Sequence, residues 1–521
     1  MPIRVAVIGG GPGGLFFAAL LRKQVPDAEV VLFERNQAAD VFGFGVVFSD
    51  ATLRHIDAAD PVLRDGLRDF GTHWDTIEVW LKSAKESFAG NGMAAIHRRV
   101  LLRLLQDRAA EIGVDMRFGQ FIGDLDELRD FDLIVGADGS NSQTREQILD
   151  GLGHAVETAS AKFIWFATSY QFSGLTFIHR QSEFGNFAIH GYPIGEGLST
   201  FIVETDEATW LRAGLDEFDV TAPPGASDLK SQTFLEKLFA DDIAGEPLVA
   251  NNSRWGNFQT RSTQTWHRDN VVLLGDAAHT AHFSVGSGTK MALEDAVALA
   301  NEVAAHQGDL ASALRNYEEE RRPKVAKIQR AARPSLSWWE HFALYYENFD
   351  PTQFAFHFFS RSIPLDKVRQ RDPEFAAAAE ADWHRRHGTP VLESALDIGG
   401  VHFPARLLEL RLDAGECWLG NGSLQSRVAM VSDPELLTAG SALLVTAPDS
   451  ESGLEPVLAA LPRPEEAAAV VVVGGTALTR TLVSEHARLR RGLTTVQVGA
   501  DRDVAATLIL SGRCDAVVLS E

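Results

Sequence analysis

Three glycines near the start of the chain have the spacing that lets a backbone hold phosphate groups. Gly9, Gly11 and Gly14 follow a short apolar, β-branched run and precede an apolar stretch with helical spacing. In such a turn the first glycine allows a tight bend, the second leaves room for a pyrophosphate, and the third permits close packing of helix and strand. Glu34 lies 20 residues past Gly14 (34 − 14 = 20), where a carboxylate can accept hydrogen bonds from a ribose. The pattern predicts a dinucleotide site.

Two later turns also place glycine and aspartate directly after apolar strands. Asp138-Gly139 ends one such run, and Gly275-Asp276 ends another. Ligands of open α/β sheets collect at the carboxyl ends of the strands, so Asp276 is placed to accept a ribityl hydroxyl. A helix is predicted to begin just after this second turn, at Gly286, Gly288 and Thr289. Its free backbone N–H groups can face the same ligand. A dinucleotide that touches all these turns must be extended, which favours FAD over NAD.

Other candidate cofactor contacts come from an arginine and a glycine-rich stretch. The apolar spacing predicts a helix over 96–108 with Arg98 and Arg99 in its first turn. The helix dipole disfavours cations in the first turn, so we expect Arg98 to bind a specific acceptor such as a phosphate. For Arg99 we expect a solvated side chain. Residues 40–53 predict either a loop whose backbone lies against something flat or a packed turn. Two more residues complete the predicted cofactor-binding set, Arg35 and Phe44.

Two polar aromatic residues stand in the β-rich middle of the chain. His190 and Tyr192 share one face of a predicted strand because side chains alternate along a strand. They could line a pocket or belong to a packed core, and the pattern does not separate these readings. A later arginine-rich run, 321–333, is typical of a solvated face, but it is also the best basic segment for a phosphate-bearing substrate. The aromatic stretch 337–349 is typical of core packing.

The composition places the chain among ordinary globular proteins and limits its partners. Of 521 residues, 45% are hydrophobic and 23% are charged. The formal net charge of −23 argues against nucleic acid or an anionic membrane surface as the main partner. Cys417 and Cys514 are the only cysteines, which fits a reducing cytosol and leaves no cysteine-based metal site. No apolar run reaches transmembrane length. We expect a cytoplasmic protein without a metal centre.

The alternation of strands and helices predicts an α/β fold with α+β character in its middle. We expect a Rossmann-like FAD-binding domain made of residues 1–159 and 266–330, interrupted by an antiparallel-sheet substrate domain at 160–265. A helical segment follows at 331–388. Residues 389–521 alternate strands and helices again, with strands predicted at 469–473, 494–498 and 515–519. They are too few for a full eight-unit barrel.

Residues 1 to about 388 resemble the single-component (group A) FAD aromatic hydroxylases, the family of para-hydroxybenzoate hydroxylase. The resemblance is carried by three ordered motifs, GGGPGG with Glu34, ADGSNSQTR, and LLGDAAH followed by GSGTK. Within the family, stretches such as KFIWFATSYQF and FHFFSRSIPLDKVRQRDPEF look closest to the salicylyl-CoA 5-hydroxylase and 2-aminobenzoyl-CoA monooxygenase/reductase subgroup. This implies a substrate held as an aryl thioester, on coenzyme A or on a carrier protein.

The resemblance also implies a mechanism and a set of catalytic candidates. NADH or NADPH reduces the FAD, O2 adds to give a flavin C4a-hydroperoxide, and an electron-rich ring is hydroxylated. The protein must orient the ring, exclude water and handle a proton. The candidate pocket groups are His282, Lys290, His190 and Tyr192, with His282 first because it directly follows the glycine-aspartate turn. Many members have a proline pair where this chain has His282-Phe283, and an asparagine where it has Lys290.

The last 130 or so residues are similar to the first and last parts of an old-yellow-enzyme barrel, with its middle missing. A rival reading is the thioredoxin-like tail of some aromatic hydroxylases. We expect this module to serve packing, homodimerisation or carrier docking rather than a second flavin reaction.

Several functions remain open from the sequence. An anthraniloyl-thioester hydroxylase and a non-oxygenating flavin oxidoreductase are the main alternatives to a salicylyl-thioester hydroxylase. A flavin-dependent halogenase is disfavoured because the sequence has no W-x-W-x-I-P stretch. A flavoprotein that acts only as a binding partner draws its support from the C-terminal module alone.

Overall fold

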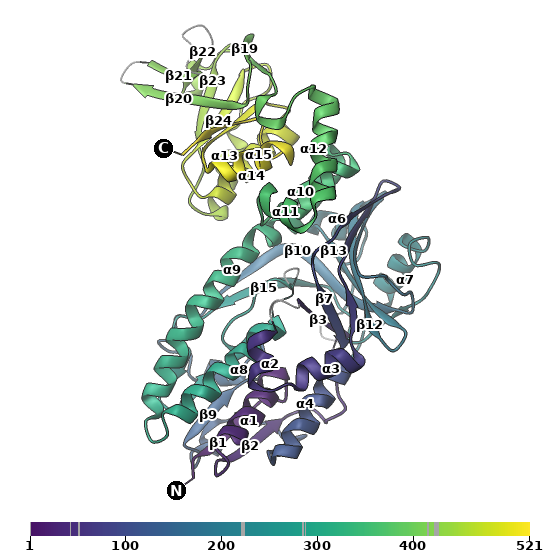
Figure 1. The fold of residues 1–521 in the computed structure, drawn as a ribbon, viewed down its shortest axis with the longest axis vertical. Helices are drawn as coiled ribbons and strands as arrows, with labels where there is room; N and C mark the ends of the chain where they lie inside the picture. The colour runs from purple at the N-terminus through teal and green to yellow at the C-terminus, as the bar shows by residue number, and fades with distance from the viewer. Residues whose placement is uncertain are drawn as a thin grey trace. The chain divides into compact units, whose positions relative to one another are not determined.

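The computed structural model describes residues 2–41, 43–49, 53–219, 225–283, 286, 288–413, 416–420 and 427–520. Parts of two predicted stretches, 40–53 and 286–289, therefore lie outside the described residues. The chain divides into two compact units, which Figure 1 colours by residue number. Unit 1 comprises Met1–Leu81 and Asn91–Glu340, and unit 2 comprises Lys82–Gly90 and His341–Glu521.

The centre of unit 1 is a mainly parallel sheet with the strand order β16-β17-β9-β1-β2-β8. Its strands are short apolar runs, and β1 and β9 are buried almost throughout, as expected for strands covered on both faces. The bounds are Arg4–Ile8 for β1, Glu29–Glu34 for β2, Asp115–Phe118 for β8, Leu133–Gly136 for β9, His267–Arg268 for β16 and Val271–Leu273 for β17. The predicted Rossmann-like sheet is confirmed.

Helices α1 (Pro12–Gln24) and α8 (Gly288–Ala305) pack against each other beside this sheet, as Figure 1 shows. Helix α1 has proline at its first position, where the missing N–H costs nothing. Helix α4 (Arg98–Ile112) begins two residues later than predicted because the preceding residues form a strand, and it ends at the left-handed Gly113. The smaller helices of this unit are α2 (Arg54–Ala59), α3 (Val62–Phe70), α5 (Gln143–Gln147), α6 (Glu207–Arg212) and α7 (Leu229–Leu238).

A three-stranded sheet lies where the sequence predicted only a loop. Strand β3 (Gly45–Ser49) pairs with β7 (Met93–His97), which also pairs with β4 (Thr72–Trp74). The prediction of a loop across 40–53 is therefore wrong for Gly45–Ser49. Residues 46–48 are Val, Val and Phe, which are strong strand formers, but their partner strand lies almost 50 residues away and leaves no local signal.

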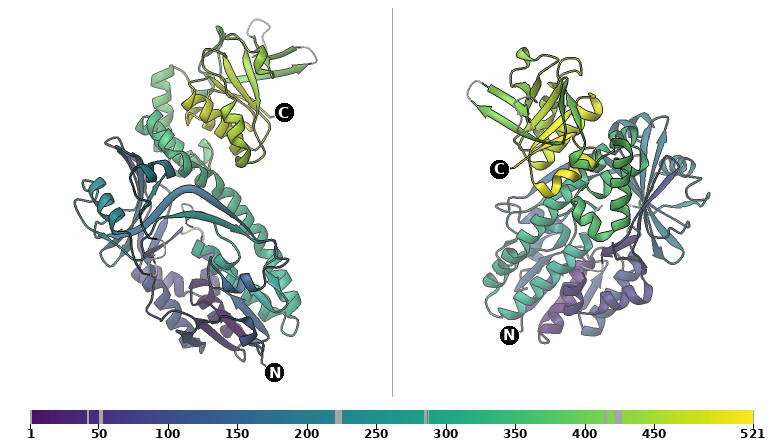
Figure 2. Two further views of the ribbon diagram at one scale, coloured as in Figure 1. Left: turned by 180° about the vertical axis from the view of Figure 1, so that it is seen from behind. Right: turned by 45° about the horizontal axis from the view of Figure 1, so that its top comes forward.

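The second sheet of unit 1 is mainly antiparallel, as predicted. Its strands run in the order β14-β10-β13-β12-β11-β5, with β15 also paired to β10, and Figure 2 shows it from two further sides. One face packs on α7 through a core that includes Phe187, Phe201 and Phe239. The bounds are Ile77–Leu81 for β5, Ala155–Thr168 for β10, Leu175–Ser182 for β11, Gly185–Gly195 for β12, Leu198–Thr205 for β13, Leu248–Val249 for β14 and Gly256–Ser262 for β15.

Unit 2 combines helices with a small closed barrel. Helix α9 (Leu310–Asn348) carries the chain across the boundary between the units, and β6 (Ala84–Phe88), α10 (Pro351–Phe359), α11 (Leu365–Arg371) and α12 (Pro373–His387) belong to unit 2. The barrel is closed by a parallel pairing of its first and last strands, so it is not the open sheet of a thioredoxin-like tail.

The barrel strands predicted from the sequence at 469–473, 494–498 and 515–519 are present as β24, β25 and β26. The barrel core contains Leu419, Val471 and Val496 among other buried apolar residues. Its strands are β20 (Leu407–Asp413), β21 (Glu416–Gly420), β22 (Arg427–Val431), β23 (Ala442–Thr446), β24 (Ala469–Val473), β25 (Thr495–Ala500) and β26 (Ala516–Leu519). A two-stranded ribbon, β18 (Leu396–Ile398) with β19 (Val401–Phe403), and helices α13 (Leu454–Ala459), α14 (Ala477–Glu485) and α15 (Arg502–Leu510) complete the unit.

Candidate functional site

Two adjoining cavities of unit 1 lie at the carboxyl ends of the parallel strands. Cavity 1, of about 220 Å3, begins at the glycine turn and is bounded by residues 33–41 and 118–122. Cavity 2, of about 300 Å3, is bounded by residues 45–47 and 274–276, by aromatic side chains of the antiparallel sheet, and by Gly286, Gly288, Thr289 and Ala292. Four residues line both cavities, namely Gly11, Arg98, Ala137 and Gly139. The two cavities therefore offer one extended site.

The three predicted glycines have different reasons to lack a side chain. Gly9 has φ +113°, and a Cβ there would lie 2.3 Å from the carbonyl oxygen of Ala137. A Cβ on Gly14 would lie 2.1 Å from the carbonyl oxygen of Gly9, so these two glycines are required by the turn itself. A Cβ on Gly11 would meet no protein atom within 4 Å. The open space at Gly11 faces both cavities, as a pyrophosphate site requires.

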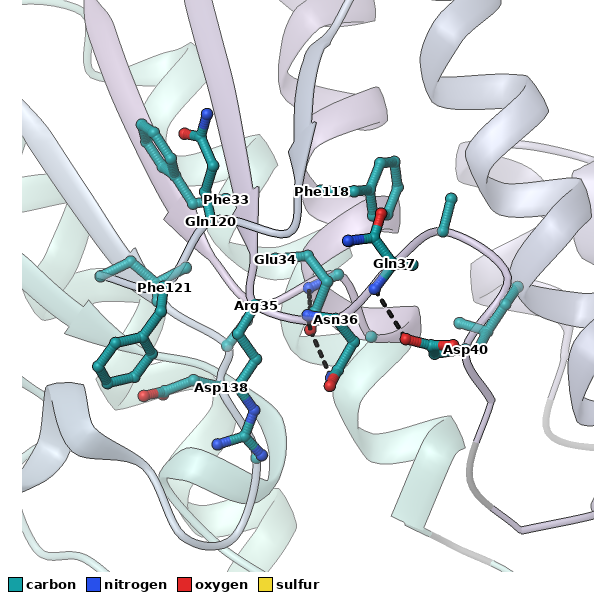
Figure 3. A pocket seen from close by; sticks show the side chains of 18 of the residues that line it. Phe33, Glu34, Arg35, Asn36, Gln37, Asp40, Phe118, Gln120, Phe121 and Asp138 are labelled. Carbon is teal, nitrogen blue, oxygen red and sulfur yellow. Dashed lines mark hydrogen bonds between the residues drawn. The ribbon is translucent and has the colours of Figure 1, made fainter. Parts of the chain in front are cut away.

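Glu34 is held firmly at the edge of cavity 1. Its Oε2 accepts a hydrogen bond from the Gly10 N–H at 2.7 Å, and its Oε1 accepts from the backbone and side-chain nitrogens of Asn36 at 2.8 and 2.7 Å (Figure 3). Each carboxylate oxygen can accept more than one bond, so a ribose hydroxyl can still be bound. Arg35 is exposed and lines the same cavity. Three phenylalanines add flat apolar surface to it, Phe33, Phe118 and Phe121.

Asp138 lines cavity 1, but its carboxylate is used within its own turn. It accepts hydrogen bonds from the Ser142 hydroxyl and from the backbone and hydroxyl of Thr144. The buried Arg145 then joins this turn to the second glycine-aspartate turn. Its guanidinium donates to the carbonyl oxygens of Ser140 at 3.1 Å and Ala277 at 3.0 Å. Arg145 lies in α5, and nothing in the local sequence signals its long-range bond to Ala277.

Arg98 occupies the junction of the two cavities, close to Asp276 and Tyr192. Burial lowers the pKa of the Arg98 guanidinium, and the negative charge of Asp276 opposes that shift. Asp276 opens into cavity 2, where desolvation by the surrounding protein raises the pKa of its carboxyl against the influence of His279 and Arg98. Arg99 is exposed, as expected. Arg98 and Asp276 thus place a cation and a hydrogen-bond acceptor midway along the extended site.

The second glycine-aspartate turn is hydrogen-bonded to a buried network of charged side chains that the sequence did not reveal. Asp295 is fully buried and accepts hydrogen bonds from the Arg321 Nε at 2.8 Å and from the Gly275 N–H at 3.2 Å, with the His279 Nε2 at 2.7 Å. Burial alone would raise the pKa of Asp295, but His279 and Arg321 hold it below its usual value. Arg321 also pairs with Glu294 at 2.9 Å. The expectation that Arg321 is solvated or binds a substrate phosphate is wrong.

Lys290 and Phe44 were predicted to belong to the site but line neither cavity. The Lys290 ammonium forms an ion pair with Glu294 at 2.8 Å, one turn further along α8. Phe44 is buried in a small apolar cluster with Trp74 and Ile194. Its carbonyl oxygen accepts a hydrogen bond from the Arg98 N–H at 2.7 Å, so Phe44 helps to place α4. Its neighbours at 45–47 line cavity 2 in its place, together with three other predicted residues, Gly286, Gly288 and Thr289.

Tyr192 projects from β12 into cavity 2. Its phenol oxygen lies 3.5 Å from the Gly45 carbonyl oxygen, and its ring stacks on Trp74 with ring centroids 6.1 Å apart. Burial raises the pKa of the phenol, so it stays protonated at neutral pH. Of the two interpretations of this strand, the structure favours a pocket residue over a packed core residue for Tyr192.

Beyond Tyr192, the same sheet face carries His190 next to Glu204 of β13, and His282 approaches them from the loop after β17. Their side chains are almost fully buried. Phe258 and Phe283 pack on the imidazole of His282 and also line cavity 2. Two of the four predicted catalytic candidates, His190 and His282, thus lie together, next to phenylalanine side chains that line cavity 2. Glu204 was missed because it sits in the apolar run LSTFIVET, although its alternation places it on the His190 face.

A buried histidine on this sheet makes the stability of unit 1 depend on pH. His179 stacks on Trp339, and burial lowers its pKa to about 3, against 6.5 in the unfolded chain. Between these values the unfolded chain binds the extra proton, so stability falls as pH drops below about 6.5, by about 1.4 kcal/mol per pH unit. Replacing His179 with Phe should therefore reduce the loss of stability between pH 7 and pH 5 by about 2 kcal/mol. Urea unfolding at both pH values measures this, and an identical loss in both proteins would contradict it.

Two further observations concern the whole of the described chain. No cluster of three or more His, Cys, Asp or Glu side chains in that part of the chain has the geometry of a metal site. Among its helices, none combines the length and the hydropathy that a membrane crossing requires.

The sequence matches two family models. Residues 7–41 match an NAD(P)-binding Rossmann-like domain, and residues 127–332 match an FAD-binding domain. The first match covers the glycine turn and Glu34. The second covers both later turns and the antiparallel sheet between them.

Several characterised proteins are similar over long stretches. The chain is 52% identical to a salicyloyl-CoA 5-hydroxylase of Streptomyces sp., over 99% of both proteins. It is 36% identical to the 3-hydroxy-4-methyl-anthranilyl-[aryl-carrier protein] 5-monooxygenase of Streptosporangium sibiricum, over 65% of this chain and 89% of that protein. It is 31% identical to the protodeoxyviolaceinate monooxygenase of Chromobacterium violaceum, over 65% of this chain and 89% of that protein.

Solved structures share the fold at lower identity. One is 2-methyl-3-hydroxypyridine-5-carboxylic acid oxygenase, with a TM-score of 0.52 and 22% identity over 67% of this chain and 97% of that one. Another is pqsL of Pseudomonas aeruginosa, a probable FAD-dependent monooxygenase, with a TM-score of 0.50 and 22% identity over 65% of this chain and 97% of that one. These likenesses concern the fold.

Proposed function

The chain belongs to the single-component FAD-dependent aromatic hydroxylases, and from that premise we propose that it hydroxylates the ring of an aromatic acid held as a thioester. The ring that fits best is salicylate, because the relative that is similar over almost the whole chain is a salicyloyl-CoA 5-hydroxylase. The enzyme is a monooxygenase that uses FAD, NAD(P)H and O2.

The observation that carries the proposal is the extended site with an aromatic end. Cavity 1 offers Glu34 and the glycine turn to the adenosine half of FAD, and Gly11 leaves room for the pyrophosphate. Arg98 and Asp276 supply opposite charges at the middle of the site. The residues of this chain therefore fit FAD on the evidence of their own geometry. Cavity 2, lined by Tyr192 and by Trp165, Phe258 and Phe283, would then hold the reactive end of the cofactor.

The reaction determines what these residues have to do. An aromatic ring, O2, NAD(P)H and one proton give the hydroxylated ring, water and NAD(P)+. Bound FAD supplies the redox and oxygen chemistry. The aromatic side chains of Phe258, Phe283 and Trp165 line cavity 2 and would offer flat, apolar surfaces to a ring. Tyr192, kept neutral by burial, can donate a hydrogen bond at that surface. His282 and His190 are proposed to handle the protons.

The chemistry of the ring agrees with a salicyl substrate. The 5-position of salicylate is para to its hydroxyl group, so the lone pair of that oxygen can drive attack at this carbon. An amino group in the same place acts in the same way, which keeps an anthraniloyl thioester as the second candidate. The anthranilyl-[aryl-carrier protein] monooxygenase among the relatives favours that candidate and also a carrier protein in place of coenzyme A.

The experiment that tests the proposal measures flavin reduction and product formation together. Free salicylate, salicyloyl-CoA, anthraniloyl-CoA and a carrier-bound salicyl thioester would each be mixed anaerobically with the FAD-loaded enzyme and NADH or NADPH. We expect the thioesters, and not free salicylate, to accelerate flavin reduction, and O2 to yield one hydroxylated product per NAD(P)H. Rapid flavin reduction without any hydroxylated product would support a non-oxygenating oxidoreductase instead.

Replacing His282 with Ala should lower the yield of hydroxylated product and raise the release of hydrogen peroxide. The loss of proton handling slows the productive step by about 100-fold, the lower range for general acid-base catalysis. The measurement is the ratio of product to NAD(P)H consumed. His55, an exposed histidine of α2, provides the control variant His55→Ala. An unchanged ratio in His282→Ala would remove His282 from the mechanism.

Other expectations stay predictions. They are the domain boundaries at 159/160, 265/266, 330/331 and 388/389, a cytoplasmic location, a homodimer, and the use of the C-terminal barrel for packing, dimerisation or carrier docking.

A further inference from the structure

Residues 119–125 form a short segment beside cavity 1 that is fixed at both ends, and we call it the strap. At its start, two of its N–H groups donate to the carbonyl oxygens of Glu34 and Asn36 at 2.9 and 3.0 Å. At its end, the Leu125 N–H donates to the Oε1 of Gln147 at 2.9 Å. The middle of the strap lines the cavity between these two attachments. The fold therefore holds this part of the cavity lining in a defined place.

Phe121, in the middle of the strap, is the most exposed of the three phenylalanines that line cavity 1. It is 60% exposed, whereas Phe33 is 5% exposed and packs against Phe131 with ring centroids 6.3 Å apart. Phe118 is half-buried. Figure 3 shows the ring of Phe121 apart from those of the other two. Much of this ring remains uncovered by the described residues, so a flat ligand that covered it would gain the stabilisation of burying apolar surface.

Gly123 determines where this ring lies. A Cβ on Gly123 would lie 3.3 Å from the Cε1 and 3.8 Å from the Cδ1 of Phe121, so the ring rests against the backbone where the glycine has no side chain. The side-chain amide of Gln147 donates to the Gly123 carbonyl oxygen at 3.3 Å and holds this backbone in place. Gly123 has no positive φ, so its role is to make room for the ring and not to allow a turn. The strap therefore supports one edge of the Phe121 ring.

The other contacts of cavity 1 indicate which ligand would cover the ring. Glu34 is placed for a ribose and Gly11 for a pyrophosphate, and both line the same cavity. The base of a nucleotide is attached to its ribose, so a base next to the Glu34 ribose belongs in this cavity as well. In the adenosine half of FAD that base is adenine. Stacking of a base on an aromatic side chain raises affinity by about tenfold to 100-fold.

The strap offers its ligand a ring and no positive charge. Asp124 is the one charged residue of the strap, and its carboxylate accepts the Asp126 N–H at 2.9 Å and so caps the next turn. A phosphate would find no cation on the strap, whereas a neutral, flat group such as adenine suits it.

We propose that Phe121 stacks on the adenine of bound FAD, and that the strap thereby determines how tightly the apoprotein binds its cofactor. Cavity 1 then binds adenosine nucleotides such as AMP by itself, without the flavin half. The inference rests on the placement of FAD that the proposed function uses, and not on which aromatic acid is the substrate.

Titration of the apoprotein with FAD, AMP and FMN tests the inference without any substrate. Replacing Phe121 with Ala should weaken the binding of FAD and AMP by the same factor, about tenfold or more, and should leave the binding of FMN unchanged. Phe121→Trp, which keeps a stacking surface, should bind FAD within about threefold of the wild type. The matched control is Phe70→Ala, because Phe70 is 54% exposed in the same unit and lines neither cavity.

Three results would overturn the inference. The first is wild-type FAD affinity in Phe121→Ala. The second is a loss of FMN binding with AMP binding unchanged, because the flavin would then lie on the strap. The third is an equal loss of FAD affinity in Phe121→Trp and Phe121→Ala, since stacking would then not be the cause. The urea midpoint of each apoprotein shows whether the variant is folded.

NAD(P)H and coenzyme A also carry adenine, and the FAD-loaded enzyme separates them from FAD. With FAD saturating, Phe121→Ala should leave unchanged the NAD(P)H concentration that half-saturates flavin reduction and the dissociation constant of coenzyme A. A weaker response to either ligand, with FAD affinity unchanged, would assign the ring to that ligand and overturn the inference. An enzyme that hydroxylates no aryl thioester would overturn the proposed function but would not change the result of these titrations.

Discussion

Replacing Gly11 with Ala should remove tight FAD binding while leaving the fold unchanged. A Cβ at Gly11 meets no protein atom within 4 Å, and the backbone there has φ −74°, which alanine adopts freely. The added methyl group instead enters the space that Gly11 leaves at the junction of the cavities. Because the pyrophosphate must approach this backbone closely, we expect FAD affinity to fall by at least about 100-fold, or about 2.7 kcal/mol.

The measurement is FAD titration of the apoprotein, with the urea midpoint of the apoprotein as the check on folding. The matched control is Gly440→Ala, at an exposed glycine of unit 2 whose Cβ would also meet nothing within 4 Å. Gly9→Ala makes a useful contrast, because its Cβ would collide with Ala137 and should lower stability as well as affinity. Wild-type FAD affinity in Gly11→Ala would mean that the pyrophosphate lies elsewhere.

Replacing Asp295 with Asn should lower the free energy of unfolding of unit 1 by about 3–5 kcal/mol. The substitution removes one of the two carboxylates that compensate the buried Arg321, and the guanidinium, left with Glu294 alone, is only partly compensated. It also weakens the hydrogen bond that anchors the Gly275 N–H. Since Asp276 follows in the same turn, FAD affinity should fall together with stability.

Urea unfolding of the apoprotein, followed by tryptophan fluorescence, measures the first effect. The double variant Asp295→Leu/Arg321→Met should recover most of the lost stability, because it removes both charges at once. The control is Asp65→Asn, which breaks an exposed pair with Arg68 and should cost less than about 1 kcal/mol. If Asp295→Asn lowered the free energy of unfolding no more than the control does, the network would contribute little to stability.

The sequence predicted the parts of the site whose signals are local. The glycine turn, Glu34 and the later glycine-aspartate turns lie at strand ends that could be read from apolar runs a few residues long. The strand at 469–473 was also predicted with its correct bounds, because a continuous run of β-branched residues is a clear strand signal when turns flank it.

The missing parts depend on contacts between distant segments. Strand β3 needs β7 as a partner, and that partner lies almost 50 residues further along the chain. Arg321 looked like one of several surface arginines, and only the packing of α9 against α8 reveals that it meets Asp295. Lys290 looked like a pocket residue, yet a glutamate one turn away on its own helix captures its ammonium.

Glu204 illustrates the limit most clearly. An isolated acid in an apolar strand gives no indication of its partners. The loop that carries His282 follows the second glycine-aspartate turn, which lies about 70 residues later in the sequence. The pairing of β12 with β13 places Glu204 on the face of His190, and this register follows from the hairpin between them rather than from either strand.

The wall shared by the two cavities has a consequence for how long a cofactor stays bound. Four residues line both cavities, namely Gly11, Arg98, Ala137 and Gly139. A ligand that fills both cavities is therefore held at both of its ends. If one end detaches, the other keeps it at a high effective concentration next to its own cavity, and rebinding outpaces escape. Retention of a dinucleotide then depends on the covalent link between its two halves more than on the affinity of either half for its own cavity. A mononucleotide fills only one cavity and gains no such advantage.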